Sequence, residues 1–370
     1  MFHLYITLAY IIPNIYVFFR IKNLFITKGY RRWYVPVYLL LAMIFPVSQN
    51  FLRHNSDFVS QFFTTIAGYI LPFFLYLFLS VLVFDLFLVL NLIFKLASAE
   101  LRKSFSFRLI AFSSLLFLSV ATVIGGAINL NTIRVSQYNI VIPKKNSTIK
   151  NLRVAFVADF HIQEKTRQRF VNQFVRKVNA LQPDIMLYGG DIVEGRGETA
   201  TSVEIESALK SIQTKYGAFG VLGNHEFYAR QDDGIFFEKA GITLLNDSII
   251  KIYDSFYLAG RYDEHFRNRK TVSEVVENNP ADLPIILLDH RPTQLQEVSQ
   301  TLVDAQFSGH THNGQLFPLN FILRQMYDLS WGYRKIENTH FFVTSGLRLW
   351  GPPVKTAGKS EIMLVDFTFE

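Results

Sequence analysis

Histidine and carboxylate side chains recur in short clusters along the second half of the sequence. The clusters are Asp159-Phe-His161, Gly190-Asp191, Gly223-Asn224-His225-Glu226, Asp289-His290 and Gly309-His310-Thr311-His312. Imidazole, carboxylate and amide oxygen without sulfur suit divalent ions such as Mn, Fe or Zn better than calcium or copper(I). The chain has no cysteine, which excludes thiolate metal sites, disulfides and a cysteine nucleophile. The clusters therefore predict divalent-metal chemistry.

Each cluster follows a short apolar run of the kind that forms a buried strand. From about Gln137 these runs alternate with charged helical stretches, as in a layered α/β domain. The expected strands cover 153–158, 184–188, 218–222, 255–259, 284–288, 303–307, 341–344 and 361–366, and the expected helices lie near 164–180 and 201–214. Because sites assemble at the C-terminal ends of strands in open α/β sheets, the clusters should converge on one place.

Five of the nine histidines fall in these clusters. The other four, His3, His54, His265 and His340, are expected to be ordinary core or surface residues. A single Asp-x-His or Gly-Asp arises by accident in many chains. Gly-Asn-His-Glu followed by Gly-His-Thr-His in this order is a specific combination.

In order and type, these clusters resemble the motifs of the calcineurin-like metallophosphoesterases. The similarity extends over roughly 137–370. The string from Ser308 to Gln315, together with the apolar N-terminal region, resembles the membrane-anchored bacterial branch of that superfamily, which is related to transmembrane proteins with a metallophosphoesterase domain. The resemblance implies a mixed α+β or α/β fold, a four-layer αββα sandwich with a two-metal centre.

The resemblance also implies a role for each clustered residue. Asp159, His161 and His312 would hold one metal, Asn224, His290 and His310 the other, and Asp191 would bridge both. His225 would stay free of metal and act near the leaving-group oxygen. Two cations about 3.5–4 Å apart can turn a shared water into hydroxide and clamp the phosphoryl oxygens. The implied activity is phosphoester or pyrophosphate hydrolysis by metal-bridging hydroxide attack.

Three residues near the clusters are candidate substrate-binding groups: Asn313, Gln315 and Arg348. Asn313 replaces a glycine that commonly follows the second histidine of the Gly-His-x-His motif. Glu194 also departs from the family pattern, because many relatives have Asp there. Neither departure touches a metal ligand in the implied set, so both bear on specificity.

An apolar, aromatic stretch follows His312 directly in the sequence. We expect Phe317, Leu319, Phe321, Ile322 and Leu323 to pack inside the domain. A lid or a lipid-facing lip beside the metal site is the alternative.

The first 133 residues form a separate, apolar region. Long windows of low charge predict four transmembrane helices at about 2–19, 33–50, 62–94 and 109–131. The third window carries only Asp85, which we expect near the membrane interface or hydrogen-bonded to a neighbouring helix. Its length and Pro72 leave two short crossings as an alternative. The chain thus divides into a four-helix transmembrane region, 1–133, and a metallophosphoesterase domain, 134–370.

Basic residues predict the orientation of these helices. Residues 1–133 carry ten basic and three acidic side chains, so the chain's net charge of +7 resides there and does not indicate a nucleic-acid binder. The segments 20–32 and 95–108 hold nine of the ten, and Arg53 lies alone between them. The positive-inside rule places both segments in the cytoplasm. We therefore expect a protein of the bacterial cytoplasmic membrane with an extracytoplasmic catalytic domain.

A membrane tether favours a substrate that is itself at the membrane. The expected partners are the bilayer and a lipid-linked or cell-envelope phosphoester. Relatives in this branch are linked to a UDP-diacylglucosamine-type pyrophosphatase reaction of lipid A synthesis on the cytoplasmic face, which stays an alternative because it conflicts with the predicted orientation. A membrane-tethered, metal-dependent binding or sensing module with little turnover is the other alternative.

Overall fold

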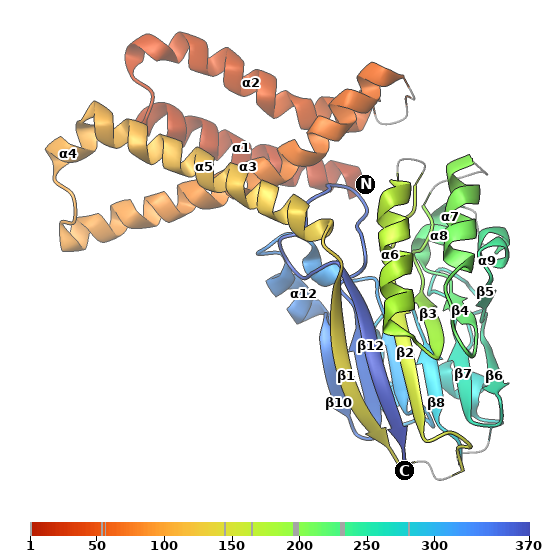
Figure 1. Ribbon diagram of the computed structural model, residues 1–370. Coiled ribbons are helices and arrows are strands. Elements are labelled where there is room, and N and C mark those ends of the chain that lie inside the picture. The colour runs from red at the N-terminus through yellow and green to blue at the C-terminus, as the bar shows by residue number, and fades with distance from the viewer. Residues whose placement is uncertain are drawn as a thin grey trace. The chain divides into compact units, whose positions relative to one another are not determined.

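The computed structural model describes residues 2–52, 55, 57–143, 146–163, 166–194, 200–229, 234–279 and 282–370 (Figure 1). Arg53, His54 and the first two residues of the helix expected near 164–180 lie outside this part of the chain. The chain forms two compact units. The first is Met1–Ile128 with Gly351–Thr356, and the second is Asn129–Trp350 with Ala357–Glu370.

Long apolar helices build the first unit. They are α1 Phe2–Leu24, α2 Arg31–Val47, α3 Phe58–Phe94, α4 Ala99–Lys103 and α5 Phe105–Leu130, with the short helical turns η1 Lys28–Tyr30 and η2 Ser48–Leu52. Among the described residues, three segments are long and apolar enough to cross a membrane: Lys28–Leu52, Phe58–Phe94 and Phe105–Leu130. They coincide with the second, third and fourth expected spans. Helix α1 occupies the place of the first, which stays a prediction.

Helix α3 is one continuous helix of 37 residues with Pro72 inside it, rather than two short crossings. At 1.5 Å per residue it is about 55 Å long. Asp85 on α3 accepts hydrogen bonds from Tyr16 and Arg20 of α1, and Arg20 Nε lies 3.1 Å and 3.0 Å from its two carboxylate oxygens. The expectation that Asp85 bonds to a neighbouring helix is confirmed.

Two six-stranded sheets form the core of the second unit. The first has the order β1-β12-β2-β3-β4-β5, with β1 Arg134–Ile142, β2 Asn151–Val157, β3 Ile185–Gly189, β4 Ala218–Val221, β5 Ile242–Leu244 and β12 Glu361–Phe369. The second has the order β10-β11-β9-β8-β7-β6, with β6 Ser248–Ile252, β7 Phe256–Gly260, β8 Ile285–Leu288, β9 Ala305–Ser308, β10 Gly332–Ile336 and β11 Thr339–Val343. Each of the eight expected strands corresponds to one of these. The sequence pattern misses β1, β5, β6 and β10.

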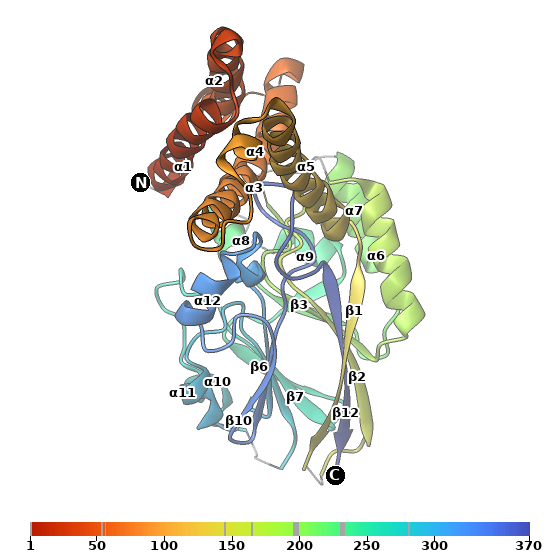
Figure 2. The same ribbon diagram turned by 90° about the vertical axis from the view of Figure 1, so that its left-hand side faces the viewer.

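Helices cover the outer face of each sheet. Phe156 and Phe307, whose ring centroids are 5.0 Å apart, belong to the apolar core between the sheets. The helices α6 Gln168–Leu181 and α7 Ala200–Lys210 pack on the first sheet, and α10 Val272–Val276 and α11 Leu295–Ser299 pack on the second. Figures 1 and 2 show the resulting layers. The prediction of a four-layer αββα sandwich is confirmed.

The carboxyl ends of the central strands meet at one edge of the sandwich. Strands β2, β3 and β4 are parallel in the first sheet, and β7, β8 and β9 are parallel in the second. His290, after β8, contacts the carbonyl oxygen of Gly189, the last residue of β3, at 2.7 Å through Nδ1. The two sheets therefore end together, and we call this end the site edge.

The chain also enters the second unit at the site edge. Arg134 at the start of β1 pairs with Glu361 at the start of β12. Strand β12 is antiparallel to β2, with Met363 opposite Phe156 near the carboxyl end of β2. The first residue of β1 therefore lies beside the strand ends that carry the candidate ligands.

The expectation for the apolar stretch after His312 is largely wrong. Phe317, Leu319, Phe321 and Ile322 are exposed, and Leu323 is half-buried. The stretch includes the seven-residue helix α12, Asn320–Met326. Only Asn320 in this helix is buried, so its apolar side chains remain outside the core.

Candidate metal centre

The five predicted clusters meet at the site edge, each in the loop or helix start that follows a strand. Asp159 and His161 follow β2, Asp191 follows β3, His290 follows β8, and His310 and His312 follow β9. Asn224 and His225 begin the helix α8, Asn224–Ala229, which follows β4. The residues expected to act together are thus brought together by segments far apart in sequence.

The backbone at these positions is unusual. The φ angle is 54° at Asp159, 48° at His161, 54° at Asp191, 69° at His310 and 49° at His312. Residues with a side chain rarely adopt positive φ, and such strain concentrates at functional sites. At Gly190, φ is +86° and a Cβ atom would lie 2.7 Å from His290 Nδ1, so glycine is required for the close approach of the two loops.

Asp159, His161 and His312 form the first group of converging ligand atoms, which all lie within 4.8 Å of one another. The Nε2 atoms of His161 and His312 are 3.2 Å apart, and His312 Nε2 is 3.7 Å from Asp159 Oδ1. On the far side of its ring, His161 Nδ1 lies 3.4 Å from Glu194 Oε2. A carboxylate at one ring nitrogen orients the other toward a metal. This donor set fits a divalent cation.

Asp191, His290 and His310 form a second group within the same 4.8 Å limit. His290 Nε2 is 3.2 Å from Asp191 Oδ2 and 3.3 Å from Asn224 Oδ1. Its other nitrogen, Nδ1, is the one that contacts the Gly189 carbonyl, which can only accept. Nδ1 therefore carries a proton, and Nε2 faces the carboxylate and the amide as a ligand atom would.

His225 belongs to a third group, with His161 and Asp191. Its backbone N–H donates to Asp191 Oδ1 at 2.8 Å, and its ring meets that of His161 edge-on at 4.6 Å. Burial disfavours the charged ring, but the Glu194 carboxylate, 3.7 Å from His225 Nδ1, and the charge of Asp191 outweigh it and raise the pKa of His225. His225 is therefore placed either to ligate a metal or to donate a proton beside it.

Buried charge makes this cluster a fitting place for cations. Burial raises the pKa of Asp159 to about 6. Burial also opposes the charged form of His290, but Asp191 outweighs it and raises the pKa to about 10. Burial, with the charge of His290, lowers the pKa of His310 to about 3. A divalent cation would take the place of the proton shared by His290 and Asp191, because metal and proton compete for one ligand atom.

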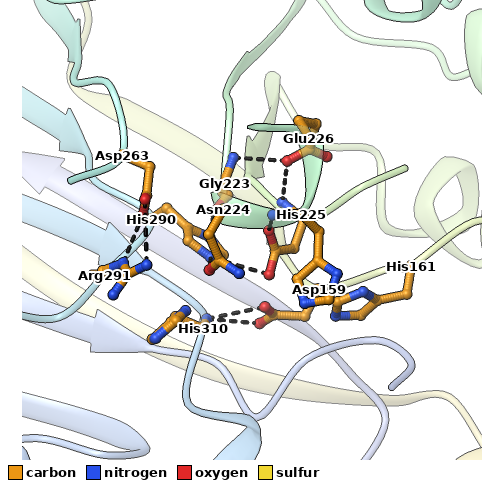
Figure 3. Close-up of polar contacts among 12 residues, drawn as sticks. Asp159, His161, Gly223, Asn224, His225, Glu226, Asp263, His290, Arg291 and His310 are labelled. Carbon is orange, nitrogen blue, oxygen red and sulfur yellow. Dashed lines mark hydrogen bonds and ion pairs between the residues drawn. The ribbon is translucent and has the colours of Figure 1, made fainter. Parts of the chain in front are cut away.

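Glu226 is a buried residue of the site edge to which the sequence pattern assigns no role. Its fully buried carboxylate accepts four backbone N–H groups, and Figure 3 shows the one from Gly223. The donors are Asp191 at 2.9 Å, Ile192 at 2.6 Å, Val193 at 2.9 Å and Gly223 at 2.7 Å. One side chain thus joins the loops after β3 and β4. Its position at the end of the Gly-Asn-His-Glu motif is the sequence signal that could have identified it.

Replacing Glu226 with glutamine is expected to weaken Mn²⁺ binding by about 10- to 100-fold, as loss of an orienting partner does at metal sites. The amide nitrogen would face N–H donors, so the loop that carries Asp191 would lose part of its support. Calorimetric titration of the detergent-solubilised chain measures the affinity. Glu238→Gln, on the exposed surface of helix α9 (Ile235–Lys239), is the matched control. Equal affinity in both variants would contradict a positioning role for Glu226.

A second polar network lies beside the centre. Asp263 is buried, and its carboxylate contacts Arg291 Nε at 2.7 Å (Figure 3) and His265 Nδ1 at 2.6 Å. His265 Nε2 lies 2.8 Å from the hydroxyl of Tyr228, whose ring centroid is 5.9 Å from that of His225. Both ring nitrogens of His265 thus have partners. No motif in the sequence marks Asp263 as part of this network.

The three predicted substrate-binding residues differ in their surroundings. The Arg348 guanidinium lies 4.7 Å from the Phe170 ring centroid, and its backbone N–H donates to the Asp159 carbonyl at 2.9 Å. Gln315 is half-buried in the turn after His312–Gly314. Asn313 is buried, and its Oδ1 has no hydrogen-bond partner among the described residues. A substrate role for these residues stays a prediction.

The two-sheet sandwich and its histidine–carboxylate edge define a class of protein. Residues 152–314 match the family model of the calcineurin-like phosphoesterases. The chain therefore contains a calcineurin-like metallophosphoesterase domain. Members of this family are phosphoester hydrolases that bind divalent metal ions.

Particular relatives share this domain. An uncharacterized metallophosphoesterase of Helicobacter pylori strain J99 is 30% identical over 220 residues, covering 58% of this chain and 59% of the relative. A transmembrane protein with metallophosphoesterase domain from Danio rerio is 29% identical over 249 residues, covering 62% and 56%. The UDP-2,3-diacylglucosamine pyrophosphatase LpxG of Chlamydia trachomatis is 24% identical over 234 residues, covering 50% and 71%. The chain spans about six tenths of the length of the Helicobacter relative.

Proposed function

We propose that this chain is a membrane-anchored, dinuclear-metal phosphohydrolase that cleaves a phosphoester or pyrophosphate bond of a lipid-linked or cell-envelope substrate. One observation carries the proposal. Two groups of ligand atoms, one with Asp159, His161 and His312 and one with Asp191, His290 and His310, converge at the site edge. Asp191 lies between them, hydrogen-bonded to the His225 backbone and facing His290.

The residues divide the chemistry among them. Two divalent ions held by these groups and by Asn224 would supply Lewis acidity at phosphorus and lower the pKa of a water molecule. Asp191 would bridge the two ions and offset part of their charge, and Glu226 holds the loop of Asp191 in place. Glu194 orients the rings of His161 and His225 from behind. His225, which is half-buried, donates a proton as the leaving oxygen gains negative charge.

The name of the Chlamydia relative supports a lipid-linked pyrophosphate as the substrate. The apolar helices support a membrane location, because three of them meet the length and composition of a span. A lipid-linked diphosphate would present two phosphorus atoms and an apolar tail to the site. We propose this class ahead of soluble monoesters.

We also propose that the metal centre lies outside the cytoplasmic membrane. Four basic residues, Lys95, Arg102, Lys103 and Arg108, lie at the ends of or between the spans α3 and α5 and favour the cytoplasm. A single crossing by α5 then brings the second unit to the opposite side. This argument does not depend on whether α1 spans, since it counts only the loop before α5.

The orientation is tested by cysteine labelling, which the cysteine-free chain allows without background. Single variants Ser147→Cys, in the second unit, and Ser104→Cys, between α4 and α5, are expressed in intact cells and exposed to a membrane-impermeant maleimide. Labelling of Ser147→Cys alone is expected. Labelling of Ser104→Cys alone would reverse the orientation and favour a cytoplasmic UDP-diacylglucosamine-type substrate.

Metal removal tests the reaction itself. The chelated, detergent-solubilised chain is expected to be inactive toward bis-p-nitrophenyl phosphate and p-nitrophenyl phosphate, and Mn²⁺ is expected to restore turnover by at least about 10³-fold. Product is followed by absorbance at matched protein concentrations. Saturable binding of these compounds without product, even after metal loading, would favour the binding or sensing module instead.

A further inference from the structure

Five exposed apolar side chains line the segment that follows the metal centre. They are Phe317, Leu319, Phe321, Ile322 and Met326, and we call them the apolar rim. Each exposes between 42% and 67% of its surface. Leu316 and Asn320, in the same segment, are buried. The apolar rim is thus the exposed part of a segment that also contains buried residues.

The rim lies at the site edge. The segment begins after His312, which follows the carboxyl end of β9, and it ends before Gly332, the first residue of β10. Gly332 pairs with Val343 of β11, and Val343 pairs with Ser308 at the end of β9. Both ends of the segment are therefore fixed beside the ligand loops, and Figure 2 shows α12 on the outer side of the second sheet.

The charge of helix α12 suits an anionic phospholipid surface. Its one charged side chain is Arg324, which is exposed, and the exposed Asp328 follows after the helix has ended. Its guanidinium lies 5.8 Å from the centroid of the Phe321 ring. Apolar side chains beside an arginine are typical of helices that lie in the headgroup region of a bilayer.

Short stretches of chain connect the site edge to the first unit. Only three residues separate the end of α5 at Leu130 from the start of β1 at Arg134. They span at most about 14 Å when fully extended. The chain leaves and re-enters the second unit around Gly351–Thr356, between β11 and β12, and those strand ends also lie at the site edge.

From these observations we propose that the apolar rim inserts into the surface of the membrane in which the chain is anchored, and that the metal centre takes its phosphoester from that surface. The occupant of the rim is the phospholipid bilayer. The uptake of a phosphoester from the membrane rests on the proposed function. The insertion of the apolar rim into the bilayer does not depend on that function, so it can be tested without measuring turnover.

Fluorescence quenching tests the contact in the full chain. Ile322→Cys and Val141→Cys are labelled with an environment-sensitive fluorophore and placed in nanodiscs of phosphatidylcholine and phosphatidylglycerol. Val141 is the matched control, because it is 52% exposed against 54% for Ile322 and lies at the end of β1 remote from Arg134. Lipids with brominated acyl chains quench a buried label, and aqueous iodide quenches an exposed one.

The label at Ile322 is expected to be quenched by brominated lipid and to be at least about threefold less sensitive to iodide than the label at Val141. Equal iodide quenching at both positions, without quenching by brominated lipid, would overturn the proposal. Protection of Ile322 from both quenchers would also overturn it, because a protein partner or second copy would then cover the rim.

Measurements of turnover test whether the contact with the membrane matters for the reaction. Ile322→Asp is expected to lower turnover of a bilayer-embedded phosphoester by about tenfold relative to Val141→Asp, because a charge in the rim opposes insertion. Turnover of soluble bis-p-nitrophenyl phosphate is expected to be unchanged in both. Equal loss on both substrates would contradict a membrane role. Inactivity of the wild-type chain on both would instead refute the proposed function and leave the quenching result standing.

Discussion

Asp191→Asn is expected to reduce kcat/KM by about 10³-fold or more and to reduce the metal content of the purified chain. Asparagine keeps the size of the side chain and one oxygen that can accept the His225 N–H at 2.8 Å. It removes the negative charge and the second carboxylate oxygen, which lies 3.2 Å from His290 Nε2. Steady-state kinetics with bis-p-nitrophenyl phosphate and elemental analysis of the same sample measure the two effects.

The matched control is Asp366→Asn on β12. Asp366 forms a partly exposed ion pair with Arg153 at 2.7 Å, and such pairs contribute about 0–1 kcal/mol. The control should keep full turnover and metal. Thermal unfolding of both variants shows whether the fold is intact. An Asp191→Asn chain that keeps its metal and near-native turnover would contradict the bridging role.

The second large effect is expected at His225, which can either donate a proton to the leaving oxygen or ligate a metal. The two roles predict different results. If His225 donates a proton to the leaving oxygen, His225→Asn should lower turnover by about 10²–10⁴-fold for an alkyl phosphoester. The loss should be much smaller for a p-nitrophenyl ester, because p-nitrophenolate leaves without a proton. Comparing kcat for the two leaving groups, with metal content in parallel, measures the difference.

A loss of the same size for both leaving groups, together with loss of metal, would mean that His225 is a ligand. The geometry makes this a real alternative, since one ring nitrogen of His225 lies within 4.8 Å of ligand atoms of His161 and Asp191. His340→Asn on β11 is the control for the same chemical change. It should leave kcat unchanged for both esters.

The central fold and the candidate ligands could be predicted because their signals are local in the sequence. Buried strands such as β3 and β9 are short apolar runs, and a ligand motif follows each one directly. The missed strands lack that signal. In β10 all five residues are exposed or half-buried, and Arg334 and Lys335 stand in its middle. Its pairing with β11 is decided by tertiary contacts rather than by periodicity.

Contacts that depend on distant segments could not be predicted. Asp263 meets Arg291 across 28 positions of sequence, and nothing near either residue marks the pair. Glu226 lies within a motif, but its partners at 191–193 come from another loop. Hydrophobicity alone also cannot tell a side chain that packs in a protein core from one that stays on the surface, and Phe321 and Ile322 are on the surface.

Electron paramagnetic resonance of the Mn²⁺-loaded chain tests the central claim most directly. Two Mn²⁺ ions about 3.5–4 Å apart and joined by Asp191 should be magnetically coupled. We predict the spectrum of a coupled pair, with two ions bound per chain, and conversion to uncoupled signals in Asp191→Asn. A spectrum of isolated Mn²⁺ at full occupancy of the active wild-type chain would contradict a dinuclear centre.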